Sequence, residues 1–284
     1  IMPVARELAV IPLSQNALVN ASPLTQTFPL FRDKSGVYHF PDTISVFGEF
    51  GFAMNVVDKR EGTNNVYQFH RAELMVDGNL EFELSYDRIP FNQGKFAKTM
   101  IEYDLKRKNL GEFQKLYRLP EHRKISIHSS DKSGILGLAP GVHSVEIRIF
   151  DAHGNKTIIR GTVAATFPMT LEASEIFRDD KVVTLALSPK RGGLALRDAV
   201  VYSFTKYGFA DKKVEIIHSE RVKKDLHITL QLRSVRERIL QIIGINQLGG
   251  MVDPFHWTDI KPEISIVDIR PNLKISNTQR GLFV

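Results

Sequence analysis

AELMVDGNLEFEL, residues 72–84, shows most clearly how this chain folds. Apolar and polar residues alternate on both sides of Asp77-Gly78, which is the pattern of strands that each bury one face. An Asp-Gly pair readily takes the positive φ angles of a tight two-residue turn. Residues 72–84 are therefore predicted to form an antiparallel hairpin.

Two further pairs of alternating runs have the same form. Residues 145–150 and 157–163 flank the polar turn 151–155, and residues 226–232 are followed by 238–245. Strands at this spacing, without helical patterns between them, are typical of β-sandwiches rather than of α/β folds. We expect an all-β chain of tandem immunoglobulin-like or fibronectin-III-like β-sandwiches.

A weak internal repeat indicates two similar domains. Residues 143–154 and 236–249 each form an alternating run that leads to a polar turn with glycine. In an immunoglobulin-like module such a strand often lies near the end of the domain. We therefore expect a first sandwich at 1–165, a second at 166–259, and the start of a further extended segment or domain at 260–284.

One segment of the first sandwich departs from the strand pattern. Between Lys95 and Tyr117 several apolar residues are four positions apart with charged residues between them, which is typical of helices. We predict a short helical insertion near 95–118, interrupted at Asn109-Leu110-Gly111. The apolar residues expected to pack it onto the sheet are Phe96, Met100, Ile101, Leu105, Phe113, Leu116 and Tyr117.

Composition excludes several classes of protein. The 284 residues are 43% hydrophobic and 25% charged, as in a globular protein, and no apolar run approaches the roughly 18 residues of a transmembrane helix. The net charge of +6 is too small to indicate a nucleic-acid partner. With no cysteine, the chain has no disulfide, no catalytic thiolate and no cysteine-ligated zinc.

The motifs of common enzymes are missing as well. Of the nine histidines no two are two, three or four positions apart, so neither HxH nor HExxH is present, and HxxxD is also missing. The sequence contains no Walker A loop, no GxGxxG and no GxSxG. We expect a chain without catalytic, metal-binding or cofactor-binding residues, and therefore no cofactor.

Three weaker features have two interpretations each. Residues 151–155, DAHGN, fit a turn better than a calcium loop. The carboxylates Glu81, Glu83 and Asp87 could supply a glycosidase pair, but Glu81 and Glu83 fit the solvent face of a strand better. Trp257, with Phe255, could stack on a sugar or could fill the core between two domains.

Positive charge is concentrated around the predicted insertion. Residues 95–132 contain ten lysines and arginines against five acidic residues. This surplus predicts a docking surface for an anionic wall polymer or an acidic neighbouring domain. The alternative is an ordinary solvated face, in which Glu102, Asp104, Glu112 and Glu121 balance the charge. The basic residues proposed for docking are Lys106, Arg107, Lys108, Arg118, Arg123 and Lys124.

A spaced series of short motifs resembles one known region. The series runs through residues 42–157 and consists of FGEFGFAMNVVD (47–58), NVY (65–67), LMVDG (74–78), IEYD (101–104), QKLY (114–117), GVH (141–143) and DAHGNKT (151–157). In this order the motifs resemble the immunoglobulin-like region that follows the catalytic domain of lysostaphin-type zinc metallopeptidases of Gram-negative bacteria. With the leading strand at Val4–Pro12, the resemblance covers about the first 165 residues.

The resemblance implies an extracytoplasmic protein that acts on peptidoglycan, with its zinc site outside this chain, since HxxxD and HxH are absent. Both ends of the sequence look cut, so we expect part of a longer polypeptide. The implied partners are the protein's own upstream catalytic domain, other cell-envelope proteins or peptidoglycan. The implied role is a non-catalytic spacer or docking module. The alternatives are a structural or adhesive surface protein without peptidase activity and a carbohydrate-binding module.

Overall fold

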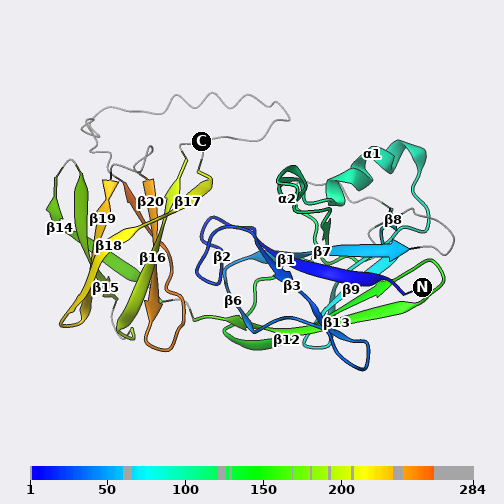
Figure 1. The fold of residues 1–284 in the computed structure, drawn as a ribbon, viewed down its shortest axis with the longest axis horizontal. Coiled ribbons are helices and arrows are strands. Elements are labelled where there is room, and N and C mark those ends of the chain that lie inside the picture. Colours follow the sequence, from blue (N-terminus) through cyan, green and yellow to red (C-terminus); the bar gives the residue numbers. More distant parts are fainter. Residues whose placement is uncertain are drawn as a thin grey trace.

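The protein is described by a computed structural model over residues 2–59, 66–120, 126–127, 130–167, 169–179, 181–190, 193–205, 208–232 and 239–258. In these ranges it is almost entirely β, with strands in two sandwiches that lie side by side (Figure 1). The predicted fold class is confirmed. Residues 260–284, expected to begin a further segment, lie outside the described ranges.

The first sandwich has two sheets that face each other across one apolar core. One sheet has the order β3 (Gln26–Pro29), β1 (Val4–Pro12), β7 (Phe50–Lys59) and β11 (Gln114–Lys115), with β8 (Val66–Tyr67) pairing β7. The other has the order β10 (Asn79–Ser85), β9 (Arg71–Val76), β12 (Gly141–Phe150), β13 (Lys156–Ala165), β5 (Tyr38–His39) and β4 (Phe31–Arg32). In addition, β6 (Ile44–Phe47) pairs with β13, and β2 (Leu18–Val19) pairs with β6. Leu8, Phe52, Leu74 and Ile147 are among the side chains buried between them.

The predicted hairpin joins β9 and β10. Asp77 and Gly78 both have positive φ, 48° and 79°, as a tight hairpin turn requires. The Asp77 carboxylate also accepts a hydrogen bond from the Ser144 amide (2.8 Å) and lies 2.7 Å from Nδ1 of His143. The turn is therefore tied to the neighbouring strand β12 through the side chain of Asp77.

The second sandwich is smaller and has its own core. Its sheets have the orders β14 (Leu171–Arg178), β15 (Val182–Pro189), β19 (Asp225–Gln231), β18 (Ile216–Val222), and β17 (Ala210–Val214), β16 (Leu196–Phe204), β20 (Ile239–Asn246), β21 (Phe255–Thr258). Val183, Leu185, Ile228, Leu240 and Ile242 are buried between them.

Trp257 belongs to this second core, and both interpretations of it from sequence are wrong. It lies opposite Leu240 in the β20–β21 register, and partners in a register share one face of the sheet. Its exposed fraction is only 9%, and the Arg178 guanidinium lies 5.6 Å from its ring centroid. The ring therefore neither presents a sugar platform nor fills the contact between the sandwiches.

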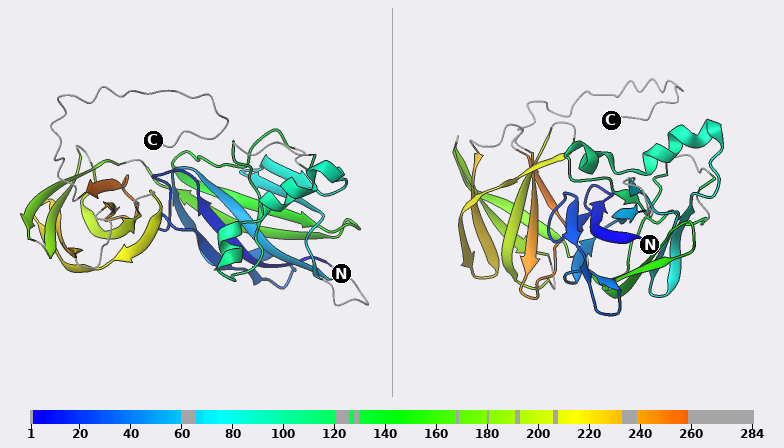
Figure 2. Two further views of the ribbon diagram at one scale, coloured as in Figure 1. Left: turned by 90° about the horizontal axis from the view of Figure 1, so that it is seen from above. Right: turned by 45° about the vertical axis from the view of Figure 1, so that its right-hand side comes forward.

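The helical insertion follows β10. It consists of η1 (Phe91–Gln93), α1 (Gly94–Ala97), η2 (Lys98–Met100) and α2 (Tyr103–Arg107), and Asn109, with φ of 57°, ends the helical part near the predicted interruption. Figures 1 and 2 place α1 and α2 on the same outer side of the first sandwich. None of the described helices is both long and apolar enough to cross a bilayer.

The predicted packing residues of the insertion are mostly buried. Met100, Leu105, Phe113, Leu116 and Tyr117 have almost no exposed area, and Ile101 is half-buried. Phe113 to Tyr117 are not helical, however. They form or flank β11, which pairs with Ala53 and Met54 of β7, so this part of the helical pattern was a strand. The side chain of Phe96 lies outside the description.

An apolar contact joins the two sandwiches. Leu18 and Ala21 of the first sandwich pack against four side chains on the outer face of the β16–β20 sheet. These four are Tyr202, Phe204, Ile243 and Met251. The Ala21 amide donates to Sδ of Met251 (2.9 Å), and Nε2 of Gln241 donates to the carbonyl of Gln15 (3.3 Å). Packing and hydrogen bonds together fix how the two sandwiches meet.

The turn at Gly78 gives a stability test. A Cβ at Gly78 meets no atom within 4 Å, so Gly78→Val acts through its positive φ rather than through a clash. We expect a loss of about 1 kcal/mol or more in the free energy of unfolding of the first sandwich. Gly137→Val, at an exposed glycine without positive φ, is the control in chemical denaturation. An equal loss in both variants would contradict the turn argument.

The contact between the sandwiches gives a second test. Leu18 is fully buried there, so Leu18→Asp places an unpaired carboxylate in an apolar site at a cost of about 3 kcal/mol or more. We expect calorimetry to resolve two unfolding transitions in this variant and one in the parent chain. Leu80→Asp, at an exposed leucine of the same sandwich, should keep one transition. Two transitions already in the parent chain would show that the contact does not couple the sandwiches.

Candidate anion-binding groove

The insertion packs on the outer face of the β1–β7 sheet. Strand β1 contains the run Leu8-Ala9-Val10-Ile11, in which Leu8 and Val10 face the core while Ala9 and Ile11 face outward. The outward pair and Ala53 of β7 are covered by side chains of the insertion, namely Leu105, Phe113 and Tyr117. A strand that is apolar on both faces needs such a cover.

Close approach of the insertion to the sheet depends on Gly51 of β7. A Cβ at this position would lie 2.5 Å from Cδ1 of Tyr117, so only glycine leaves room for the ring. Tyr117 thereby packs directly on the sheet, with its hydroxyl directed back into the insertion. It donates a hydrogen bond of 2.9 Å to Oε2 of Glu102.

Glu102 and Lys115 complete the base of the site. Nζ of Lys115 lies 3.8 Å from Oε2 of Glu102 and donates to the carbonyl of Thr99 at 3.2 Å. Burial raises the pKa of Tyr117, and the carboxylate of Glu102 raises it further. Tyr117 therefore stays protonated and acts as a fixed donor to Glu102.

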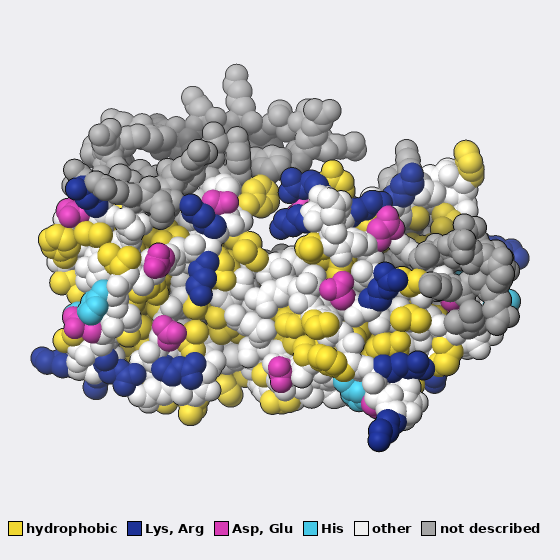
Figure 3. Space-filling model, viewed as in Figure 1, with side chains coloured by type: hydrophobic (Ala, Val, Ile, Leu, Met, Phe, Trp, Pro, Cys, Tyr) yellow, Lys and Arg dark blue, Asp and Glu magenta, His cyan; other side chains and the backbone are white. Residues whose placement is uncertain are grey.

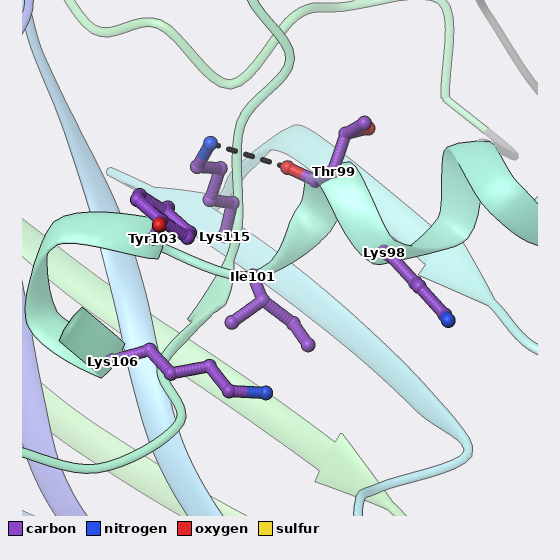
Figure 4. A pocket seen from close by; sticks show the side chains of 6 residues that line it. All are labelled: Lys98, Thr99, Ile101, Tyr103, Lys106 and Lys115. Atoms are coloured by element: carbon purple, nitrogen blue, oxygen red, sulfur yellow. Dashed lines mark hydrogen bonds between the residues drawn. The ribbon is translucent and has the colours of Figure 1, made fainter. Parts of the chain in front are cut away.

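A groove with a cavity volume of about 590 Å³ opens above this base (Figure 4). Figure 4 shows Lys98 of η2 and Lys106 of α2 with Ile101 between them. Nζ of Lys106 forms an ion pair of 2.5 Å with Glu112, whereas no carboxylate of the described chain pairs with Lys98. The six lining residues are Lys98, Thr99, Ile101, Tyr103, Lys106 and Lys115.

This arrangement is suited to binding an anion with an apolar part. Ammonium groups bind anions, while Ile101 and the ring of Tyr103, 69% exposed, give the groove apolar walls. In the described residues, no group of three acidic or histidine side chains is arranged to hold a metal ion.

The basic residues proposed from the sequence are only partly brought together. Lys106, Arg107 and Lys108 are exposed at the end of α2, where dark-blue side chains gather in Figure 3. Arg107 pairs with Asp104 at 3.5 Å, as the solvated-face alternative expects. Arg118 is half-buried, and its Nε has no hydrogen-bond partner among the described residues. Arg123 and Lys124 lie outside the described residues.

Sequence reasoning missed Lys98 and Lys115 as site residues. They come from η2 and β11, which are separated along the chain by α2, so no local motif joins them. The only signal was the position of Lys115 in the QKLY motif, two residues before the buried Tyr117.

The other acidic candidates are occupied in the structure. Glu81 pairs with Lys132 (2.7 Å), and Glu83 lies 3.8 Å from Arg71. Oδ1 of Asp151 accepts the amides of His153 and Asn155, both at 2.8 Å, so residues 151–155 form the turn that the sequence predicted. These carboxylates balance charge or cap a turn.

The fold and groove define an all-β chain of two sandwiches with a basic pocket on a helical insertion. Neither a protein-family model nor a curated protein sequence matches it. Among solved structures, it is similar to dimeric latent PorU from Porphyromonas gingivalis, with 12% identity over 80% of this chain and 19% of that one and a TM-score of 0.22.

Two more structures show similarity at the same low level. One is SGBP-B of the Bacteroides ovatus mixed-linkage glucan utilization locus in complex with a heptasaccharide (14% identity, 86% of this chain and 47% of that one, TM-score 0.22). The other is a tetra-tandem repeat in the extending region of a large adhesion protein (13%, 75% and 48%, TM-score 0.22). The chain spans about a fifth of PorU and just under half of each of these two. Similarities this low assign no function.

The base of the groove gives a third test. Tyr117→Phe removes the donor to Glu102, and a hydrogen bond to a charged group contributes about 1.5–3 kcal/mol. We expect the free energy of unfolding of the first sandwich to fall by this amount in chemical denaturation. Tyr103→Phe, at an exposed ring of the same groove, should be neutral. If the two variants are equally stable, Tyr117 does not anchor the insertion through Glu102.

Proposed function

We propose that this chain is a non-catalytic binding region of an exported cell-envelope protein, the accessory part of a peptidoglycan endopeptidase. In this proposal the helical insertion is the surface that docks an anionic partner. The observation that supports docking is the groove, which is lined by three lysines and an exposed tyrosine. The link to a peptidase is supported by the motif resemblance.

The motifs that carry the resemblance meet in the groove. IEYD (101–104) supplies Ile101, Glu102 and Tyr103, and QKLY (114–117) supplies Lys115 and Tyr117. A third motif, residues 47–58, contains the glycine on which Tyr117 packs. Segments that are far apart in the sequence thus build one site, which supports a binding role for the region that they define.

Peptidoglycan is the partner that fits best. Its peptide stems carry carboxylates, and an insoluble anionic polymer would concentrate near a surface of exposed lysines and arginines. The acidic face of a neighbouring domain is the alternative partner, and the same surface would bind it.

A spacer role is supported by a second observation. Leu18 and Ala21 join the two sandwiches through a buried apolar contact, which limits their relative motion. A rigid pair can hold a docking surface at a fixed distance from the rest of a longer protein. Docking and spacing are compatible roles, since the groove and the contact use different residues.

Co-sedimentation with purified, insoluble peptidoglycan tests the docking proposal. The variant replaces Lys106, Arg107 and Lys108 by Gln, and the control replaces three exposed lysines elsewhere, Lys34, Lys213 and Lys224, by Gln. We expect the docking variant to bind about tenfold more weakly at about 0.01 M salt and the control to bind like the parent chain.

Two results would contradict the proposal. Retention of the parent chain no stronger than that of an unrelated basic protein would remove peptidoglycan as the partner. Equal losses in the docking variant and the control would mean that overall charge, rather than the insertion, causes binding.

A further inference from the structure

We propose that the groove on the insertion binds the terminal carboxylate of a peptide whose last side chain is apolar. The inference rests on the proposed function, because it names the part of a peptidoglycan stem that the insertion would hold. It is argued from the charge, the walls and the volume of the groove.

The charge of the groove favours a single negative charge. Of its three ammonium groups, that of Lys115 pairs with Glu102 and that of Lys106 pairs with Glu112. Lys98 pairs with no carboxylate of the described chain, so the groove has a net charge of about one positive unit. A peptide carboxylate neutralises that charge. A phosphate dianion or a dense polyanion would leave excess negative charge beside Glu102 and Glu112.

The position of each lysine assigns it a role. Lys115 is the lysine least available to a ligand, because its side chain is only 11% exposed and its ammonium group already donates to the carbonyl of Thr99. Lys98 and Lys106 extend from η2 and α2 on the two sides of Ile101 (Figure 4). A carboxylate above Ile101 would accept from Lys98 first and from Lys106 second.

The walls favour an apolar group next to that carboxylate. The side chain of Ile101 lies between the two lysines, and the exposed ring of Tyr103 also lines the groove. The methylene stems of Lys98 and Lys106 add apolar surface. The volume of about 590 Å³ lies within the range of about 300–1,000 Å³ that is usual for small-ligand pockets. A chain end with an apolar side chain satisfies both the charge and the walls.

The experiment compares three probes on the full chain by calorimetric titration or by NMR of labelled lysines. They are acetyl-Ala-Ala with a free carboxylate, its C-terminal amide and inorganic phosphate. We expect the acid to bind in about the millimolar range and the amide and phosphate to bind about tenfold more weakly. The largest lysine shift should be at Lys98.

Variants assign the binding to the groove. Lys98→Gln should weaken binding of the acid about tenfold, and Lys98→Arg should largely retain it, since arginine keeps the charge. Lys213→Gln, at an exposed lysine of the second sandwich, is the matched control. Glu112→Gln raises the net charge of the groove by one unit and should therefore strengthen phosphate binding relative to the acid.

Several outcomes would overturn the inference. These are equal binding of the acid and the amide, tighter binding of phosphate than of the acid by the parent chain, or no effect of Lys98→Gln. If the chain does not bind the peptides but still co-sediments with insoluble peptidoglycan, only this inference is wrong and the proposed function stands. If the chain binds the acid but does not co-sediment with insoluble peptidoglycan, the proposed function is wrong, whereas the groove is still a carboxylate-binding site.

Discussion

The packing of Tyr117 on Gly51 is the contact on which the rest of the first sandwich's outer surface depends. It presses the return segment of the insertion onto β7 and directs the tyrosine hydroxyl to Glu102, which lies beside Lys115. Without that close approach, Ala9 and Ile11 of β1 would lose their cover. The groove therefore forms because the insertion packs on the sheet. Its lysines are positioned by this buried apolar contact, and no local sequence motif joins them.

Many charged side chains of this protein are balanced by a neighbour of opposite sign, so an unpaired lysine that lines a groove is informative. Glu146 bonds to both Arg148 and Arg160, at 2.6 and 2.8 Å, so the open face of the β12–β13 pair offers little free charge. In the insertion, Lys106, Arg107 and Lys115 are balanced in the same way. Lys98 pairs with no carboxylate of the described chain, and it lines the same groove as the exposed ring of Tyr103. An unbalanced charge next to an apolar wall is a more specific feature than the overall surplus of basic residues.

Elements that depend on neighbouring residues could be predicted from the sequence. Features that depend on strand pairing between distant segments could not. The hairpin at Asp77-Gly78 could be predicted because turn chemistry and alternation act over a dozen residues. Phe113 to Tyr117 were assigned to a helix because spacing alone cannot show that β7 offers a free edge to pair with. Trp257 was misplaced because its direction depends on its register with Leu240. Lys98, Lys106 and Lys115 could not be grouped, since only the folded path of the insertion brings them together.

The bond between Asp77 and His143 makes the first hairpin sensitive to acidity. The hydrogen bonds with His143 and Ser144 lower the pKa of Asp77, and the bond with Asp77 raises the pKa of His143. Asp77 therefore stabilises the folded hairpin fully above its unfolded pKa of about 3.9, and this stabilisation is lost as the pH falls through the lowered value. His143 stabilises the folded hairpin fully below its unfolded pKa of about 6.5, and this stabilisation is lost as the pH rises through the raised value. Between these limits both ends of the bond are charged, so the turn is held most firmly in mildly acidic surroundings and loosens on either side of that window.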